Sequence, residues 1–226
     1  MEIINRREQV NIRDAHTVLT RVLLACGVLV APLFFAVALV EILIRPAFDI
    51  RRMAISSLTL GDLGWIQILN FEITGLLMIA CAFGVRRALR GRRGGAWAPI
   101  LLGVAGAGTV VAGIFHPDPA LGFPQGAAAG MPATMSAQAT VHQIASMATF
   151  ACTIATCFVL ARKFAGDGRR VWMTYCLASG LLAPVLLVLA LGDRDWVGVL
   201  LAAMVAVAFG WVSAVVARLR ADEQRA

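Results

Sequence analysis

The sequence has little charge and few of the side chains that carry out acid–base chemistry. Charged residues make up 15% of its 226 residues, and it has three histidines and one tyrosine. It contains neither the HExxH pattern of zinc peptidases nor the GxSxG pattern of serine hydrolases, so neither class is indicated. The formal net charge of +7 comes without a nucleic-acid-binding motif, and we expect no nucleic-acid partner.

The polar loops of the chain contain no cysteine. All five cysteines fall within apolar stretches, where a thiol behaves as a small buried side chain. The sequence therefore predicts neither disulfides nor a cysteine zinc site, and it points to no particular cofactor. The five are Cys26, Cys81, Cys152, Cys157 and Cys176.

Long apolar stretches fill most of the chain. Hydrophobic residues make up 60% of it, and its mean hydropathy of +0.81 is far above that of a soluble domain. A helix that crosses a membrane needs about 20 apolar residues. Six stretches are long enough, so the sequence predicts an all-α, polytopic membrane protein built as a six-transmembrane-helix bundle. They are 18–44, 65–89, 96–115, 139–161, 171–192 and 196–217.

The basic residues predict how the bundle is oriented. Sixteen of the twenty Lys and Arg residues lie near the termini or in the turns after the second and fourth spans. Cytoplasmic segments carry such an excess, so both termini are expected in the cytoplasm, as an even number of spans requires. We expect a cytoplasmic segment at 1–17, a membrane domain at 18–217 and a cytoplasmic tail at 218–226.

Two long loops on the other side, 46–64 and 116–138, have a distinctive composition. Both mix Pro, Gly, Asp and Ser with aromatic residues, and the prolines and glycines of 116–138 predict a fixed, non-helical path for that loop over the mouth of the bundle. Pro32 and Pro184 lie inside the first and fifth spans, where a proline kinks a helix and can open a cavity. We therefore expect a polar pocket beneath these loops, since function concentrates in loops of this kind.

The fourth span carries a stripe of polar residues that begins at His142. Helical periodicity places its members on one face, and a polar face within a membrane must meet protein or water. Serine and threonine alone would suit contacts between helices, whereas His142 leaves a functional role open. The other members are Ser146, Thr149, Thr153 and Thr156.

Two acidic residues also lie in predicted spans, at a cost of about 2.5–3.5 kcal/mol each near the membrane centre. Glu72, which follows Gln67 and Asn70, either forms a hydrogen bond between helices or carries a proton. Glu41 lies one turn before Arg45, and this spacing predicts a local ion pair at the membrane interface.

Residues on the outer side suggest two constellations. His116, Asp118 and His142 are candidate metal ligands, since two histidines and a carboxylate could hold zinc and activate water. Arg51 and Arg52 are suited to a phosphate or carboxylate head group. The candidate ligand-binding residues are Asp49, Arg51, Asn70, Glu72 and Ser146, and the candidate catalytic residues are Arg52, Ser56, Asp118 and His142.

Short motifs around these loops resemble a known family. They are Arg45-Pro46, Asp49, Arg52, Ile55-Ser56, Gly64-Trp65, Asn70 with Gly75, Phe115-x-x-Asp118-Pro119, Gly122-Phe123-Pro124 and His142. As a set they are similar to the bacterial integral membrane family called domain of unknown function 998, over about residues 20–215. The resemblance implies a six-helix bundle in the bacterial inner membrane and no particular reaction. His116 does not belong to the family pattern, which weakens the zinc set.

Three hypotheses about function follow. The pocket binds a lipid, isoprenoid or other amphiphile from the outer leaflet, with Arg52 holding its polar head and His142 and Asp118 forming hydrogen bonds. Alternatively, His142 and Asp118 act as acid and base on a lipid-like substrate, with or without a metal. In the third hypothesis, Glu72 and the polar stripe carry protons in a coupled transporter.

Overall fold

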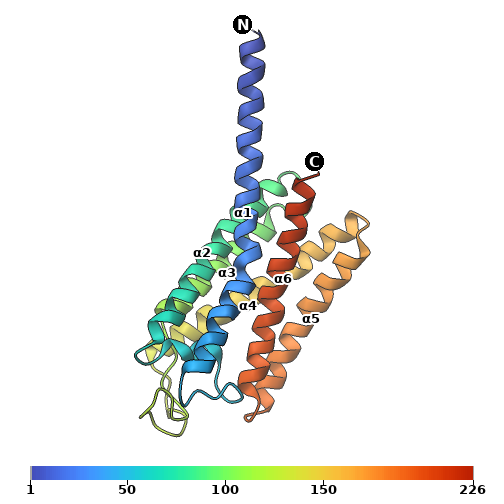
Figure 1. Cartoon of the computed structure of the whole chain (residues 1–226). Helices are drawn as coiled ribbons and strands as arrows, with labels where there is room; N and C mark the ends of the chain where they lie inside the picture. The colour runs from blue at the N-terminus through green and yellow to red at the C-terminus, as the bar shows by residue number, and fades with distance from the viewer. Residues whose placement is uncertain (1, 226) are drawn as a thin grey trace.

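The computed structural model describes the backbone of residues 2–225 and the side chains of residues 17–225. Within this described part the chain forms six α-helices and one short 3-10 helix (Figure 1). Each α-helix contains a span long and apolar enough to cross a membrane, which confirms the predicted all-α, polytopic bundle. The elements are α1 (Glu2–Ile44), η1 (Ile55–Thr59), α2 (Gly64–Ala88), α3 (Trp97–Ile114), α4 (Ala137–Gly166), α5 (Arg170–Gly192) and α6 (Val197–Glu223).

The helices match the predicted spans closely, but three of them are longer. The backbone of α1 is helical from Glu2, well before its apolar span Thr17–Ile44, and this part rises above the bundle in Figure 1. No glycine or proline precedes Gly27, so nothing in the local sequence ends the helix. α4 and α6 likewise continue past their apolar spans, to Gly166 and Glu223.

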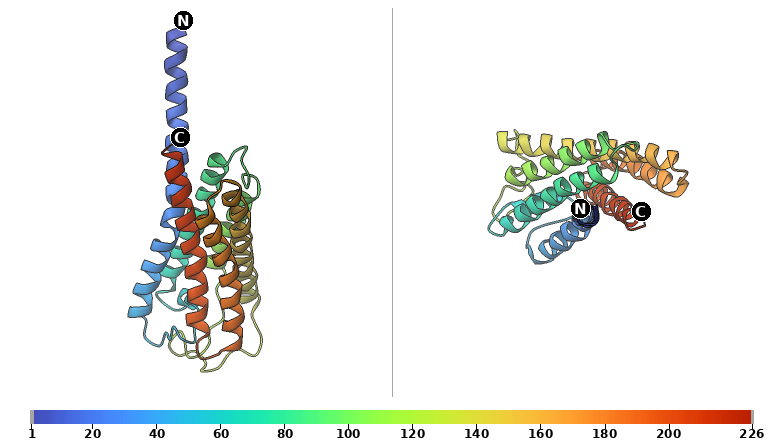
Figure 2. Two further views of the ribbon diagram at one scale, coloured as in Figure 1. Left: turned by 90° about the vertical axis from the view of Figure 1, so that its right-hand side faces the viewer. Right: turned by 90° about the horizontal axis from the view of Figure 1, so that it is seen from above.

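The six helices form a closed ring. Each helix packs against the next one in the chain, and α6 packs against α1 (Figure 2). Both termini and the turns after α2 and α4 lie at one end of the bundle, which we call the basic end. The 46–64 and 116–138 loops lie at the other end, here called the loop end.

Small residues allow close helix contacts within this ring. A Cβ atom on Gly75 of α2 would lie 2.7 Å from the Gly106 carbonyl oxygen of α3, and the reverse distance is also 2.7 Å. Close approach through glycine is typical of membrane helices. Between α6 and α1, the Ser213 hydroxyl accepts a hydrogen bond from the Ala31 amide (3.0 Å) and donates one to the Gly27 carbonyl (3.1 Å). This serine therefore joins the last helix to the backbone of the first.

Aromatic side chains fill the middle of the bundle on the loop-end side. The Phe34 ring of α1 packs edge-on against Phe71 of α2 and Phe209 of α6, with ring centroids 5.5 and 5.1 Å apart. All three are buried. Offset contacts of this kind hold aromatic rings in defined positions. The cluster forms the floor of the pocket described next.

Candidate functional site

A pocket of ≈130 Å³ lies inside the ring beneath η1. It separates α4 from α6, two helices that make few contacts with each other. α1, α2, α3 and α5 also contribute to its wall. The lining residues are Phe34, Ala54, Ile55, Ser56, Phe71, Thr109, Ala112, His142, Gln143, Ser146, Met147, Thr149, Phe150, Leu187, Leu201, Ala202, Met204, Val205 and Phe209.

His142 is the most constrained polar side chain of this wall. Its Nδ1 lies 2.9 Å from the Ala112 carbonyl oxygen and 2.8 Å from that of Phe115, both at the end of α3. A carbonyl oxygen only accepts, so Nδ1 carries a proton and Nε2 is the acceptor in the neutral ring. The Ser146 hydroxyl lies 3.5 Å from Nε2, one turn along α4. The backbone of α3 therefore fixes the orientation of the imidazole ring.

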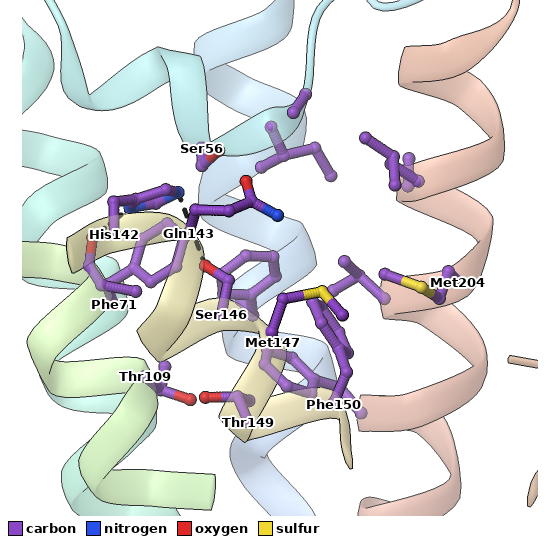
Figure 3. A pocket seen from close by; sticks show the side chains of 18 of the residues that line it. Ser56, Phe71, Thr109, His142, Gln143, Ser146, Met147, Thr149, Phe150 and Met204 are labelled. Carbon is purple, nitrogen blue, oxygen red and sulfur yellow. Dashed lines mark hydrogen bonds between the residues drawn. The ribbon is translucent and has the colours of Figure 1, made fainter. Parts of the chain in front are cut away.

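The pocket has a polar end and an apolar end. His142, Gln143, Ser146 and Ser56 gather beneath η1, as Figure 3 shows. Apart from Thr109 and Thr149, whose hydroxyls both donate to the Ala105 carbonyl, the rest of the wall consists of aromatic, aliphatic and thioether groups, including Phe150 and the phenylalanine cluster of the floor. A cavity with few convergent polar groups on an apolar wall is typical of small-molecule sites.

Arg45 supports the 46–64 loop from beneath. Its guanidinium donates hydrogen bonds to the carbonyl of Leu58 (3.2 Å) and to that of Leu60. It also pairs with the fully buried Glu41 at 3.3 Å and lies 5.0 Å from the centre of the Phe123 ring. The predicted ion pair is confirmed, and it is buried under the loops.

The same loop is held from the other side by α6. The Gly198 amide donates to the Arg51 carbonyl at 2.8 Å, and the glycine Cα sits against the backbone of Ile50 and Met53. The next residues, Ala54 to Ser56, cover the pocket. They are therefore clamped between α1 and α6.

The 116–138 loop is fastened at its base by two side-chain contacts. Asp118 accepts a hydrogen bond from the Ser136 amide at 2.8 Å, and Ser136 caps α4 by accepting from the Ala139 amide at 3.1 Å. These contacts with Ser136 lower the pKa of Asp118, so the carboxylate stays ionised at neutral pH. His116 pairs with Gln138. Both loop residues thus hold the start of α4.

The structure brings together only some of the residues chosen from the sequence. His142, Ser146 and Ser56 line the pocket, whereas Asp118 and His116 lie in the loop beside the start of α4. Among the side chains of residues 17–225, no three His, Cys, Asp or Glu groups are placed to share a metal ion. The proposed zinc set is therefore not assembled here.

The charged candidates of the 46–64 loop lie outside the pocket. Arg51 donates three hydrogen bonds to the Asp49 carboxylate, one from its amide at 3.0 Å and two from its side chain at 3.1 Å, and these contacts lower the pKa of Asp49. Arg52 is exposed. None of the three lines the pocket, so in this arrangement Arg52 is not placed to hold a head group there.

The candidates of α2 also face away from the pocket. Asn70 donates to the Phe34 carbonyl and to the Gln67 side chain, both at 3.0 Å, and so joins α2 to α1. Glu72 packs one carboxylate oxygen against Gly113 of α3, where a Cβ atom would lie 2.7 Å from it. That oxygen has no hydrogen-bond partner among the described residues.

The deeper part of the α4 stripe forms hydrogen bonds with the backbone. Thr149 donates to the Ala105 carbonyl of α3 at 3.1 Å. Thr153 and Thr156 donate to carbonyls one turn back in α4, at 2.8 and 2.7 Å. Neither Thr153 nor Thr156 lines the pocket. Their hydroxyls are satisfied within protein, as expected for contacts in a helix bundle.

A comparison with protein-family models gives one match, the family described as Protein of unknown function (DUF998), over residues 28–218. The chain belongs to this family. The matched residues include all those that line the pocket and both loops of the loop end. Neither curated proteins nor solved structures yielded a match.

Two polar residues that line the pocket, Thr109 and Gln143, were not singled out from the sequence. Thr109 lies in α3 and donates to the Ala105 carbonyl of its own helix, whereas Gln143 lies in α4. It follows His142 directly and is exposed, so it falls off the face defined by the polar stripe. A glutamine inside a predicted span is itself an unusual feature, because its amide needs partners there. That signal could have identified it.

Proposed function

We propose that the protein binds a lipid-like or amphiphilic small molecule in the pocket beneath η1. The observation that carries this proposal is the division of one cavity into a polar end around His142 and an apolar floor around Phe34. Such a cavity matches a molecule with a polar head and a hydrocarbon body. The α3 carbonyls that orient His142 make its Nε2 a fixed contact for the head.

The proposal includes an orientation in the membrane. We assign the protein to the bacterial inner membrane, with residues 1–17 and 218–226 in the cytoplasm and the membrane domain at 18–217. The excess of Lys and Arg at the basic end supports this assignment. The pocket then opens toward the extracytoplasmic half of the bilayer, where its ligand would come from the outer leaflet.

Binding is favoured over the enzymatic and transport hypotheses by the positions of two carboxylates. An acid–base pair needs both groups within hydrogen-bond reach of a substrate. Asp118 holds the start of α4 and does not line the pocket with His142. Glu72 packs against α3 outside the pocket. The hydroxyls of Thr153 and Thr156 donate to the backbone of α4, so these side chains do not form a chain of hydrogen bonds that could carry a proton from Glu72.

The first experiment is lipid analysis of purified protein. Wild type, His142→Ala and Thr153→Ala are purified in mild detergent, and bound lipids and metals are quantified by mass spectrometry. We expect one defined lipid at near one per chain in wild type and Thr153→Ala, and its loss in His142→Ala. Thr153 is a matched control because it lies on the same helix but outside the pocket.

The opposite outcomes separate the hypotheses. Equal lipid content in all three proteins would contradict the proposed site. Stoichiometric zinc that disappears with His142→Ala would instead support a metal-assisted enzyme, since an open zinc site activates water.

A further inference from the structure

We infer that the ligand of this pocket is an uncharged amphiphile with a hydroxyl head, and that it enters head-first from the bilayer between α4 and α5. This inference rests on the proposed binding function and narrows its ligand class and its route.

The first argument is the absence of charge from the wall. None of the described residues that line the pocket is Asp, Glu, Lys or Arg. An ionised head group taken from water into such surroundings, without a partner of opposite charge, is strongly disfavoured. The nearby Arg45 is buried under the loop and already contacts Glu41 and the carbonyls of Leu58 and Leu60. Phosphate and carboxylate heads therefore meet no lysine or arginine in this cavity.

The second argument is the hydrogen-bonding direction of His142. Its Nδ1–H is directed at the Ala112 and Phe115 carbonyls, which leaves Nε2 as an acceptor in the neutral ring. The Ser146 hydroxyl is 3.5 Å away, too distant to hold Nε2 firmly. A ligand O–H can donate to Nε2, while Ser56 and Gln143 can donate to the ligand oxygen. A hydroxyl group satisfies both requirements at once.

The third argument is size. The pocket volume of ≈130 Å³ is similar to that of an engineered apolar cavity of about 150 Å³ that accepts benzene. It has room for a head and the first few carbon atoms, but not for a whole long chain. The tail of an amphiphile must therefore lie outside the pocket.

The fourth argument is the position of the opening. Of the described residues that line the pocket, only Gln143 and Met147 are exposed, and both lie on α4. Leu187 of α5 lines the pocket as well, and α5 ends at Gly192. On the loop side, the covering segment is clamped by Arg45 and Gly198. The side between α4 and α5 is thus the open one, and there a hydrocarbon tail would meet lipid.

The experiment uses full-length protein in lipid nanodiscs and three probes with the same chain. 1-Decanol has a donor, decyl methyl ether has only an acceptor, and decanoate at pH 8 is ionised. Binding is measured as the concentration-dependent rise in Tm, because a ligand that binds only the folded state stabilises it. The variants are His142→Ala, Leu187→Trp, which fills the opening, and Leu181→Trp. Leu181 is a matched control because it is 59% exposed on α5 and does not line the pocket.

We expect 1-decanol to stabilise wild type and Leu181→Trp, and to have no saturable effect on His142→Ala or Leu187→Trp. The ether should bind about tenfold more weakly because one hydrogen bond is lost. Decanoate should not bind. Leu187→Phe adds a smaller side chain than Leu187→Trp and should give an intermediate affinity for 1-decanol. This second variant still tests the route if Leu187→Trp does not fold.

Decanoate binding as well as 1-decanol would overturn the ligand class, and unchanged binding to both Leu187 variants would overturn the route. If no probe binds while wild type retains a lipid that depends on His142, the inference fails and the proposed function stands. If no probe binds and no such lipid is retained, both fail.

Discussion

The buried side chain of Arg45 connects α1 to both loops of the loop end. It touches a carboxylate on its own helix, two carbonyls of the 46–64 loop and the Phe123 ring of the 116–138 loop. A planar guanidinium presents five donors in a fixed fork and stacks on aromatic rings, whereas a lysine ammonium presents three donors on a single nitrogen. Both outer loops therefore depend on one buried cation.

Arg45→Met should destabilise the protein by about 3–5 kcal/mol, since it leaves Glu41 buried and unpaired. The double variant Glu41→Met/Arg45→Met should recover part of that loss. Arg51→Met is the control, because the Arg51–Asp49 pair is exposed and its loss should leave stability unchanged. Thermal unfolding in detergent measures all three, and a double variant less stable than Arg45→Met would contradict this account.

Single residues of the site were predictable where helical periodicity decides the outcome. The spacing of His142 and Ser146 placed both on one inward face, and both line the pocket. Periodicity does not tell which hydroxyls bond to their own backbone, so the role of Thr153 and Thr156 had to come from the structure. For Asp118, the sequence does not reveal that the carboxylate accepts a hydrogen bond from the amide of Ser136.

At the scale of elements, the 46–64 loop covers the pocket and is held in place by contacts with Arg45 of the α1 end and Gly198 of α6. Its path depends on the close approach of its backbone to the first turn of α6 at Gly198. A side chain there would contact the backbone of Ile50 and Met53, which cannot move aside like a flexible side chain. Gly198 is therefore required by the backbone of the 46–64 loop that packs against it, and not by the conformation of α6.

Gly198→Ala should therefore lower stability by about 1–3 kcal/mol and weaken ligand binding through displacement of the cover. Gly210→Ala in the same helix is the control, since no atom outside the local helix lies within 4 Å of its added Cβ. Alanine favours helix, so this control should be neutral or more stable by up to about 1 kcal/mol. Unfolding midpoints of the two variants test the contrast, which fails if Gly198→Ala matches Gly210→Ala.

The helices themselves were largely predictable, because an uninterrupted apolar stretch of about 20 residues is the mark of a membrane-spanning helix. The ends of the helices were less predictable. Beyond the apolar spans of α1 and α6 the sequence is polar, and hydropathy alone cannot show that the helix continues. The path of the two outer loops depends on contacts with Arg45 and Phe123 that are distant in sequence.

At the scale of the whole molecule, the ring places both termini and the short basic turns at one end. The pocket lies toward the other end, beneath the 46–64 loop. Which end faces the cytoplasm is the proposal drawn from the distribution of Lys and Arg. It determines which leaflet supplies the ligand.

That orientation predicts the behaviour of reporter fusions in a bacterial host. Green fluorescent protein joined after residue 226 should fluoresce, because it folds in the cytoplasm. Alkaline phosphatase inserted after Gly126 should be active, because it requires the periplasm. Gly126 is a suitable site since nothing lies within 4 Å of its Cβ position. Active phosphatase at the C-terminus would contradict the assignment.

The contact between α1 and α6 has a consequence for biosynthesis. α1 leaves the ribosome first, yet the Ser213 hydroxyl that joins Ala31 and Gly27 arrives with the last helix. Met204 and Phe209 of α6 also complete the wall of the pocket. A nascent chain that has inserted five helices carries His142 in place but has no enclosed cavity. The proposed ligand would therefore find an enclosed pocket only once the C-terminal helix has docked against the first.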